Sequence, residues 1–427
     1  MQRSASSPNS PRVPGSLLGL LAFGQCMALI DRNLPAVAAP LMKADLALSD
    51  AQFGLLQGFS FALLYATGML LSWPLAYSMR RLQLLAACAA TWTSGMLVFA
   101  FGHTFGALLV GRALVGLGES MFEPLALGLV VAHVAPAWRA RSMALLTAAS
   151  VAGRSLSLLL GGAVLAGLAR WLPTQPPMHW RLLFVVMALP NLLTIVWLLR
   201  SAELALNPFP PRPRKVFVAV LNAFGERPRV LGAYLCSAAA ALLVARALGA
   251  WAPSVLHREQ GFAPATAALV FGAAMLIASP LGDFIAGILV DKFRSPMAIL
   301  TAALLLAAPA LGAMPWAGSP MVACVLLTLA AVLTGAAAVA VLYGWPSMLD
   351  PSLRDAGLRV FLVFIVLISE GLGPWLAGTV SDGMGTGAHA LSLALSRVCM
   401  LAAAMGVAAA LLARAGRPRP AVEEAAG

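Results

Sequence analysis

Twelve apolar segments follow one another along the 427-residue chain, and this feature limits the possible folds more than any other. A helix that crosses a bilayer needs about 20 apolar residues, and each segment is about that long or longer. An isolated strand would leave its backbone polar groups unsatisfied in lipid. The segments lie at 16–42, 51–77, 82–101, 106–133, 142–168, 180–200, 230–255, 264–290, 297–315, 319–348, 357–380 and 390–413. They predict an all-α polytopic membrane protein with twelve transmembrane helices.

The composition argues against a soluble protein. Hydrophobic residues make up 61% of the chain and charged residues 10%, whereas soluble domains carry about 25% charged residues. The motifs H-E-x-x-H and G-x-S-x-G, a Walker lysine loop and C-x-x-C pairs are all absent from the sequence. These absences argue against a membrane enzyme, direct use of ATP and a zinc or redox site. We therefore expect no enzymatic activity, no cofactor and no bound metal.

The basic residues between the apolar segments indicate how the chain lies in the membrane. The net charge is +12, but Lys and Arg are concentrated in the loops on one side. The loops on the other side contain only Lys43, Arg170, Arg181 and Arg258. Because positively charged loops stay in the cytoplasm, we expect both termini there, in the inner membrane of a bacterium. No basic run is interleaved with aromatic residues, so we expect no nucleic-acid partner.

A polar stretch rich in proline and arginine divides the chain near its middle. One constant offset across it places Asp31 on Arg246 and Ala76 on Asp291. Two parallel repeats of this kind predict a binding site at their interface, near the middle of the bilayer. The expected organisation is a disordered cytoplasmic N-terminus at 1–15, a six-helix bundle at 16–200, a cytoplasmic linker at 201–229, a pseudo-symmetric six-helix bundle at 230–413 and a cytoplasmic tail at 414–427.

The loop after the segment at 264–290 carries a recognisable motif. Residues 287–294 read G-I-L-V-D-K-F-R, which resembles the signature G-x-L-x-D-[RK]-x-x-R of the major facilitator superfamily. The equivalent loop of the first half keeps the basic pair Arg80 and Arg81 but lacks the glycine and the aspartate. The resemblance implies the major facilitator fold and a cytoplasmic gate that includes Asp291, Arg80 and Arg81. Asp283, two turns before Asp291, is expected to serve the same gate.

Within the superfamily, the chain is most similar to the spinster-like branch. The similarity rests on Asp31-Arg32, residues 46–54, residues 112–124, Trp180-Arg181 and residues 371–382. It implies proton-coupled secondary active transport, with one acid at 16–42 and one at 106–133 as coupling groups. The anion:cation symporters share an Asp-Arg pair and a similar segment at 106–133, so an importer of a small carboxylate is an alternative. The altered first gate loop also leaves open a receptor of the same fold that does not transport.

Charged residues inside the apolar segments mark the candidate site. Each costs roughly 2.5–3.5 kcal/mol at a helix centre, so these residues should face the bundle interior or a water-filled pathway. They are Asp31, Arg32, Arg112, Glu119, Glu123, Arg154, Arg246, Asp283, Glu370 and Arg397. Acids and bases are present in equal number, so they can pair with one another there.

We expect proton coupling to involve Asp31, Arg32, Glu119 and Glu123. Neighbouring residues on a helix point about 100° apart, so Asp31 and Arg32 cannot simply neutralise each other. Glu119 and Glu123 are four residues apart and share one face. Coupling requires a carboxyl that holds a proton in a dry setting and releases it when a cation approaches. The alternative is a static ion pair that holds two helices together.

We expect substrate binding to involve Arg112, Arg154, Arg246, Tyr343 and Glu370. Guanidinium groups suit bidentate capture of a carboxylate or phosphate, and Tyr343 lies on a segment that faces the cavity in the superfamily. The expected substrate is a small organic solute, amphipathic or anionic, that is moved by alternating access. Pairing of the arginines with Glu370 is the structural alternative. The expected partners are this substrate, protons and the lipid bilayer, and the protein is expected to be a monomer.

Overall fold

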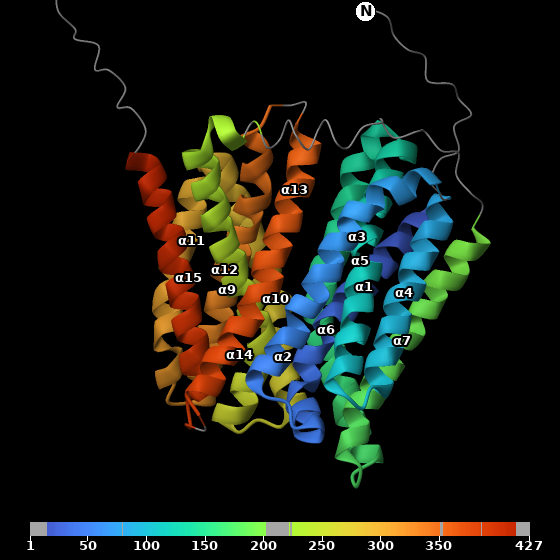
Figure 1. Ribbon diagram of the computed structural model, residues 1–427, viewed down its shortest axis with the longest axis vertical. Coiled ribbons are helices and arrows are strands. Elements are labelled where there is room, and N and C mark those ends of the chain that lie inside the picture. The colour runs from blue at the N-terminus through green and yellow to red at the C-terminus, as the bar shows by residue number, and fades with distance from the viewer. Residues whose placement is uncertain are drawn as a thin grey trace, which may run out of the picture.

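The computed structural model describes residues 15–78, 80–201, 222, 224–350, 353–385 and 387–415. Within these ranges, twelve helical segments are long and apolar enough to cross a membrane (Figure 1). The expected all-α architecture with twelve spans is therefore confirmed. The elements are α1 (Gly15–Leu46), α2 (Asp50–Gln57), α3 (Phe59–Ser78), α4 (Arg81–Phe101), α5 (Phe105–His133), α6 (Pro136–Trp171), α7 (Pro176–Arg200), α9 (Pro228–Gln260), α10 (Pro264–Phe293), α11 (Pro296–Ala313), η1 (Met314–Trp316), α12 (Pro320–Ser347), α13 (Arg354–Val366), η2 (Leu367–Leu372), α14 (Gly373–Gly383) and α15 (Ala390–Ala415).

Proline and capping residues determine where many of these helices begin. The helices α6, α7, α9, α10, α11 and α12 have proline in their first turn. Proline is favoured there because its missing N–H would have no intrahelical partner anyway. The start of α2 is a capping box, in which Ser49 and Gln52 bind each other's backbone N–H groups. These local signals explain why the observed bounds lie close to the segments expected from hydropathy.

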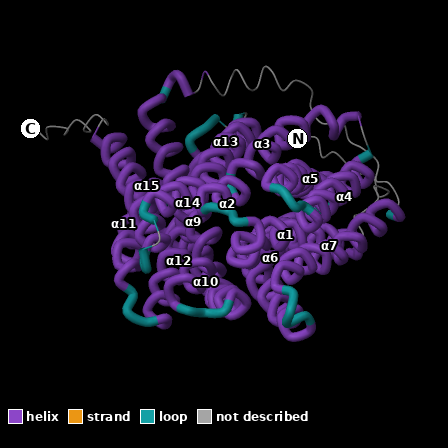
Figure 2. Tube along the Cα trace, turned by 60° about the horizontal axis from the view of Figure 1, so that its bottom comes forward, coloured by secondary structure: helices purple, strands orange, loops and turns teal. Residues whose placement is uncertain are grey.

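The helices pack as two bundles that stand side by side. In the first bundle, α5 packs against α3 and α4, and α1 packs against α6 and α7. In the second, α9 packs against α12 and α15, and α12 also packs against α10 and α11. The bundles meet where α6 packs against α10, and where α2 lies beside α14 at the lower end in Figure 1. Figure 2 shows the same arrangement as a tube, with α2 next to α14 and α9.

Two spans are interrupted, and the interruptions face each other. The span formed by α2 and α3 breaks at Gly58, and η2, a π-helical turn that contains Glu370, joins α13 to α14. A Cβ atom on Gly58 would collide with the carbonyl oxygens of Glu370 and Gly371. Turns of this kind are frequent at functional sites, and this one places Glu370 at the interface between the bundles.

Glycines allow the backbones of α2 and α14 to touch. A Cβ atom on Gly378 would lie 2.6 Å from the carbonyl carbon of Asp50, and one on Gly54 would lie 2.8 Å from the Cα atom of Trp375. No side chain fits at such distances. Small residues at helix contacts permit this close approach in membranes, where helix association depends on packing.

The expected terminal and linker segments lie mostly outside the described residues. They are the N-terminus at 1–15, the linker at 201–229 and the tail at 414–427. The helices that flank them are described: α1 begins at Gly15, α7 ends at Arg200, α9 begins at Pro228 and α15 ends at Ala415. The division of the chain into these five parts stays a prediction.

Candidate functional site

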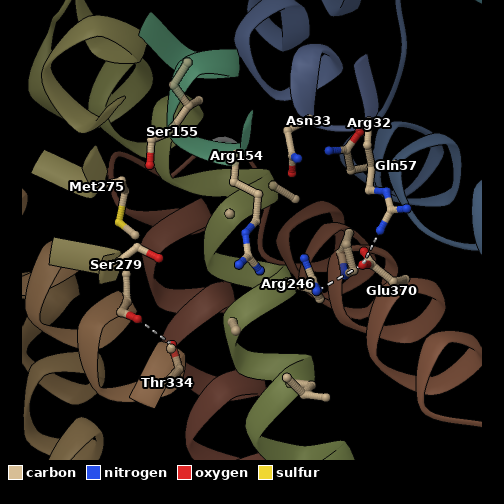
Figure 3. Close-up of a pocket in the computed structure, with 18 of the residues that line it drawn as sticks. Arg32, Asn33, Gln57, Arg154, Ser155, Arg246, Met275, Ser279, Thr334 and Glu370 are labelled. Atoms are coloured by element: carbon tan, nitrogen blue, oxygen red, sulfur yellow. Dashed lines mark hydrogen bonds and ion pairs between the residues drawn. The ribbon is translucent and has the colours of Figure 1, made fainter. Parts of the chain in front are cut away.

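A cavity of about 130 Å³ lies between the two bundles. Its polar lining comes from both halves and comprises Arg32, Asn33, Gln57, Arg112, Arg154 and Ser155 from the first, and Arg246, Ser279, Thr334 and Glu370 from the second (Figure 3). Its apolar lining includes Leu158, Leu242, Phe271 and Met275. The cavity therefore combines an arginine-rich surface with an apolar one.

A chain of ion pairs crosses from one bundle to the other through Arg32. The Arg32 Nε atom lies 2.8 Å from Glu119 Oε2, and Arg32 Nη1 lies 3.9 Å from Glu370 Oε1. Glu370 Oε1 in turn lies 2.9 Å from Arg246 Nε (Figure 3). Glu119 of α5, Glu370 of η2 and Arg246 of α9 are thus brought together with Arg32. All three were expected to take part in coupling or binding.

The Arg32 side chain is held in place by aromatic rings and by Arg112. Its guanidinium lies 4.8 Å from the ring centroid of Phe61 and 4.9 Å from that of Tyr65. The guanidinium of Arg112 lies 4.9 Å from the Phe61 ring, and its Nη2 donates to the backbone carbonyl of Arg32 at 2.6 Å. The same nitrogen also donates to Gln57 Oε1 at 3.4 Å. Arg112 therefore positions the Arg32 segment as well as lining the cavity.

Arg154 is different from the other arginines of the cavity. Its side chain projects from α6 toward Arg246 (Figure 3), and it makes no hydrogen bond or ion pair with any described residue. Its Nε atom is buried without a partner. The positive charge of Arg246 lies near enough to repel it. An anion placed between these two guanidinium groups would satisfy both.

Asp31 does not line the cavity. Neighbouring side chains on a helix point about 100° apart, so Asp31 faces a different direction from Arg32. Its Oδ2 accepts a hydrogen bond from Asn191 Nδ2 of α7 at 2.7 Å, and the residue is 1% exposed. No described Lys, Arg or His lies within ion-pair distance of it. Asp31 therefore lies inside the first bundle, between α1 and α7.

At the end opposite the start of α1 and the end of α15, four residues join the bundles. We call them the latch: Asp50, Arg258, Ser381 and Asp382. Arg258 Nη1 of α9 donates to both carboxylate oxygens of Asp50, at 2.9 and 2.7 Å, and Ser381 Oγ donates to Asp50 Oδ2 at 2.7 Å. The Asp382 carboxylate accepts from the backbone N–H groups of Asp50 and Ala51, at 2.9 and 2.8 Å. Lys43 also pairs with Asp50 from within the first bundle.

A family model described as Major Facilitator Superfamily matches residues 21–374. The chain belongs to the major facilitator superfamily. It is therefore an integral membrane transporter of small molecules and not an enzyme. This membership confirms the family and the fold that the loop motif at 287–294 indicated.

Relatives of this superfamily member include named efflux pumps. An MFS-type efflux pump of Mycolicibacterium smegmatis is 28% identical over 432 residues, which cover 98% of this chain and 96% of that protein. A purine ribonucleoside efflux pump of Salmonella enteritidis is 25% identical over 327 residues, which cover 74% of each.

Solved superfamily structures share the fold. A bacterial homologue of the human lysosomal transporter Spinster, in an inward-facing and unoccupied conformation, has a TM-score of 0.81 at 24% identity and is matched over 98% of this chain and 100% of that one. A D-xylose-proton symporter has a TM-score of 0.73 at 17% identity, over 95% and 98% of the two chains. The architecture of this superfamily member is therefore spinster-like.

Tyr343 and Glu123 neither line the cavity of this superfamily member nor pair with a residue that does. Tyr343 is 53% exposed on the outer face of α12, whereas α12 presents Thr334 and Gly335 to the cavity. Glu123 is half-buried on α5, one turn beyond Glu119, and it makes no hydrogen bond or ion pair with any described residue. The structure brings neither of them to the Arg32–Glu370–Arg246 chain.

The expected gate residues are not joined to one another in the described part of the chain. Arg80 and Asp291 are exposed at helix ends, and Arg81 is buried at the start of α4. Asp283 is half-buried on α10, where its charge attracts Arg154 of the other bundle. The structure describes the bundles in contact at the latch. Asp50, Ser381 and Asp382 belong to the spinster-like motifs, and Arg258 is one of the basic residues of the loops on the opposite side of the membrane.

Asn191 and Gln57 are site residues that sequence reasoning missed. Each is an amide inside an otherwise apolar span and contacts a charged residue of the site, Asp31 or Arg112. A polar side chain in such a span is the signal that would have found them. Within the described ranges, no group of three or more His, Cys, Asp or Glu side chains is placed to hold a metal ion.

Proposed function

We propose that this superfamily member exports an amphipathic organic anion in exchange for protons, by alternating access, with both termini in the cytoplasm. The surplus of guanidinium groups in the central cavity is the observation that carries the proposal. Four arginines line the cavity, and among the described residues the carboxylates within ion-pair distance of them are Glu119 and Glu370. An anionic substrate would balance the remaining charge.

Arg154 and Arg246 supply the expected contact with that anion. They come from different bundles, repel each other and line one cavity. A carboxylate or phosphate between them would form charge-assisted hydrogen bonds to both and so draw the bundles together. The neighbouring Leu158, Phe271 and Met275 suit the hydrocarbon part of an amphipathic molecule.

The surroundings of Glu119 and Asp31 support proton coupling. Glu119 binds Arg32, whose Nη1 is also 3.9 Å from Glu370 in the other bundle. A proton on Glu119 would release Arg32 toward Glu370 and so change the attraction between the bundles. Asp31, the residue before Arg32, is buried and accepts a hydrogen bond from the side-chain amide of Asn191. A proton on either carboxyl would therefore bias the equilibrium between the two transport conformations.

The relatives and the loop charges support the direction of transport. The mycobacterial and Salmonella relatives are both named efflux pumps. With the termini in the cytoplasm, the latch would close the cavity toward the outside, because α1 starts at Gly15 and runs toward the latch residue Asp50. A transporter held in this state would load its substrate from the cytoplasmic side.

Transport of three octyl compounds by the purified protein in proteoliposomes tests the proposal. Octyl phosphate and octanoate should move against an imposed proton flow, whereas octylamine should not. Asp31→Asn and Glu119→Gln should lose the acceleration that the pH gradient provides. Asp45→Asn, which removes a carboxyl paired with Arg181 outside the cavity, is the matched control and should retain it.

Other outcomes of the same assay would contradict the proposal and indicate a different function. If both variants respond to the pH gradient as the wild type does, the two carboxyls form a static support and do not couple transport to protons. Movement of octanoate in the same direction as protons would indicate an importer of small carboxylates. Binding of the octyl anions with no movement under any gradient would indicate a receptor.

A further inference from the structure

The outer surface of α15 carries a positive charge that the central site does not use. Arg397 is exposed there, whereas the other charged residues expected to face the bundle interior, all within the described ranges, are buried or half-buried. Arg397 therefore faces the lipid. It makes no hydrogen bond or ion pair with any described residue. An arginine on the lipid-facing side of a span is costly unless its guanidinium reaches polar headgroups, so this one requires a partner in the membrane.

A second cavity, of about 510 Å³, lies at the latch end of the second bundle. It is lined by the end of α9, the loop between α11 and α12 and the start of α15, and these segments contribute Glu259, Trp316, His389 and Leu393. Three of the candidate membrane spans begin or end at this cavity. It therefore lies at the boundary between membrane and water, where lipid headgroups are found.

Glu259 gives this cavity a negative charge. Its side chain is 4% exposed, and its Oε1 accepts a hydrogen bond from the backbone N–H of Ser392 at 2.8 Å. Its Oε2 lies 3.6 Å from Nδ1 of His389, which carries a charge only when it is protonated. No other Lys, Arg or His of the described chain lies within ion-pair distance of Glu259. With His389 neutral, a bound cation would balance the carboxylate.

An indole lies in the same lining. Trp316 is 76% exposed and lines the cavity together with Glu259. Tryptophan is enriched at membrane–water interfaces, and the face of its ring attracts ammonium groups. A buried carboxylate and an exposed indole in one cavity therefore suit an organic ammonium group.

Arg397 belongs to a stripe of residues that descends from this cavity into the membrane. Leu393, which lines the cavity, and Arg397 are four residues apart and so share one face of α15. Side chains on a helix lean toward its N-terminus, which is the cavity end of α15. The next members of the stripe, Leu401 and Met405, are exposed and apolar. Neighbouring Met400 reaches Gly312 of α11, which lies beside α15 (Figures 1 and 2).

The order of chemical groups along this stripe identifies the ligand class. From the membrane surface inward, the protein presents a carboxylate, a guanidinium and then apolar side chains. A phospholipid with an ethanolamine headgroup presents an ammonium, a phosphate and hydrocarbon chains in the same order. We propose that this surface binds one ethanolamine phospholipid, with its phosphate on Arg397 and its ammonium between Glu259 and Trp316. A phospholipid with a glycerol headgroup offers no cation to Glu259.

The lipid site is separate from the transport pathway. None of its residues lines the central cavity, so a bound phospholipid does not compete with the substrate anion for Arg154 or Arg246. Loss of the lipid should leave the affinity of the central cavity for octyl phosphate unchanged. The lipid site therefore stands or falls independently of the proposed function.

Native mass spectrometry of the purified full-length protein tests the site with two lipids that have the same acyl chains. The wild type should retain the ethanolamine lipid about tenfold more tightly than the glycerol lipid, as one charge-assisted hydrogen bond implies. Arg397→Gln should bind the ethanolamine lipid about tenfold more weakly. Glu259→Gln should bind the two lipids alike, and its amide oxygen can still accept from Ser392. Arg170→Gln, an exposed arginine at the same end of the first bundle, is the matched control and should behave as the wild type does.

The remaining outcomes overturn the proposal. Equal retention of the two lipids by the wild type, or an unchanged preference in Glu259→Gln, would show that the ammonium is not recognised. Full affinity of Arg397→Gln for the ethanolamine lipid would remove the phosphate contact. Displacement of the lipid by an equal concentration of soluble phosphoethanolamine would identify a site for a soluble ligand in place of a membrane lipid.

Discussion

The Glu370 carboxylate lies 2.9 Å from the Arg246 guanidinium, and both side chains line the cavity between the bundles. The same oxygen of Glu370 is 3.9 Å from Arg32 in the first bundle. Glu370 therefore stands where a substrate anion would bind, as a negative charge that the protein itself supplies. A substrate anion would have to compete with it for Arg246, and the π-helical turn of η2 places Glu370 at that point.

Removal of the Glu370 negative charge should strengthen the binding of a substrate anion. We expect Glu370→Gln to raise the affinity for octyl phosphate about tenfold, since a charge-assisted hydrogen bond contributes on the order of 1.5 kcal/mol. Calorimetric titration in nanodiscs measures the change. Glu259→Gln, at the far end of the second bundle beside His389, is the control. Weaker binding of octyl phosphate to Glu370→Gln would mean that Glu370 supports the site and does not compete for it.

Loss of the latch should open the end of the protein at which the bundles meet. Arg258 binds Asp50 through two hydrogen bonds, but its side chain is 36% exposed, so solvent reduces the contribution to about 1 kcal/mol, or about fivefold in population. In Arg258→Ala, spin labels at His103 and Ala388 should therefore report a larger fraction of long distances. Arg170→Ala removes an exposed charge at the same end and should leave the distances unchanged. Identical distance distributions in the two variants would show that the latch does not hold the bundles.

The contact between α2 and α14 should tolerate no side chain at Gly378. A Cβ there would lie 2.6 Å from the Asp50 carbonyl carbon, so Gly378→Ala must push the helices apart at a cost of about 1–3 kcal/mol. We expect a lower thermal unfolding temperature and slower transport. Gly383→Ala, in the same helix with open space around it, should change neither quantity. Equal behaviour of the two variants would contradict the close packing of α2 and α14.

Sequence reasoning predicted the fold because lipid imposes it. Each span had to be a helix of sufficient length, so the apolar segments predicted the number and order of the spans. Helix geometry also predicted that Asp31 and Arg32 point in different directions. They do, because Arg32 faces Glu119 and the cavity while Asp31 faces Asn191.

The remaining features depend on how the helices are rotated and which of them meet. Helix α12 is apolar on all sides, so no polar stripe indicated that Thr334 and not Tyr343 faces the cavity. The latch joins Asp50 to Asp382, residues 332 positions apart, and no local pattern relates them. The pair Asn191–Asp31 is likewise separated by 160 positions. Such contacts follow from tertiary packing and not from periodicity.

The affinity of Arg154→Gln for octyl phosphate and octylamine, compared with that of the wild type and of Arg170→Gln, tests the central claim most directly. The wild type should prefer octyl phosphate, and Arg154→Gln should bind it about tenfold to a hundredfold more weakly, because hydrogen bonds to charged groups contribute about 1.5–3 kcal/mol. Arg170→Gln, an exposed arginine outside the cavity, should bind as the wild type does. A wild type that prefers octylamine, or an Arg154→Gln variant that keeps full affinity for octyl phosphate, would contradict an anion site between the bundles.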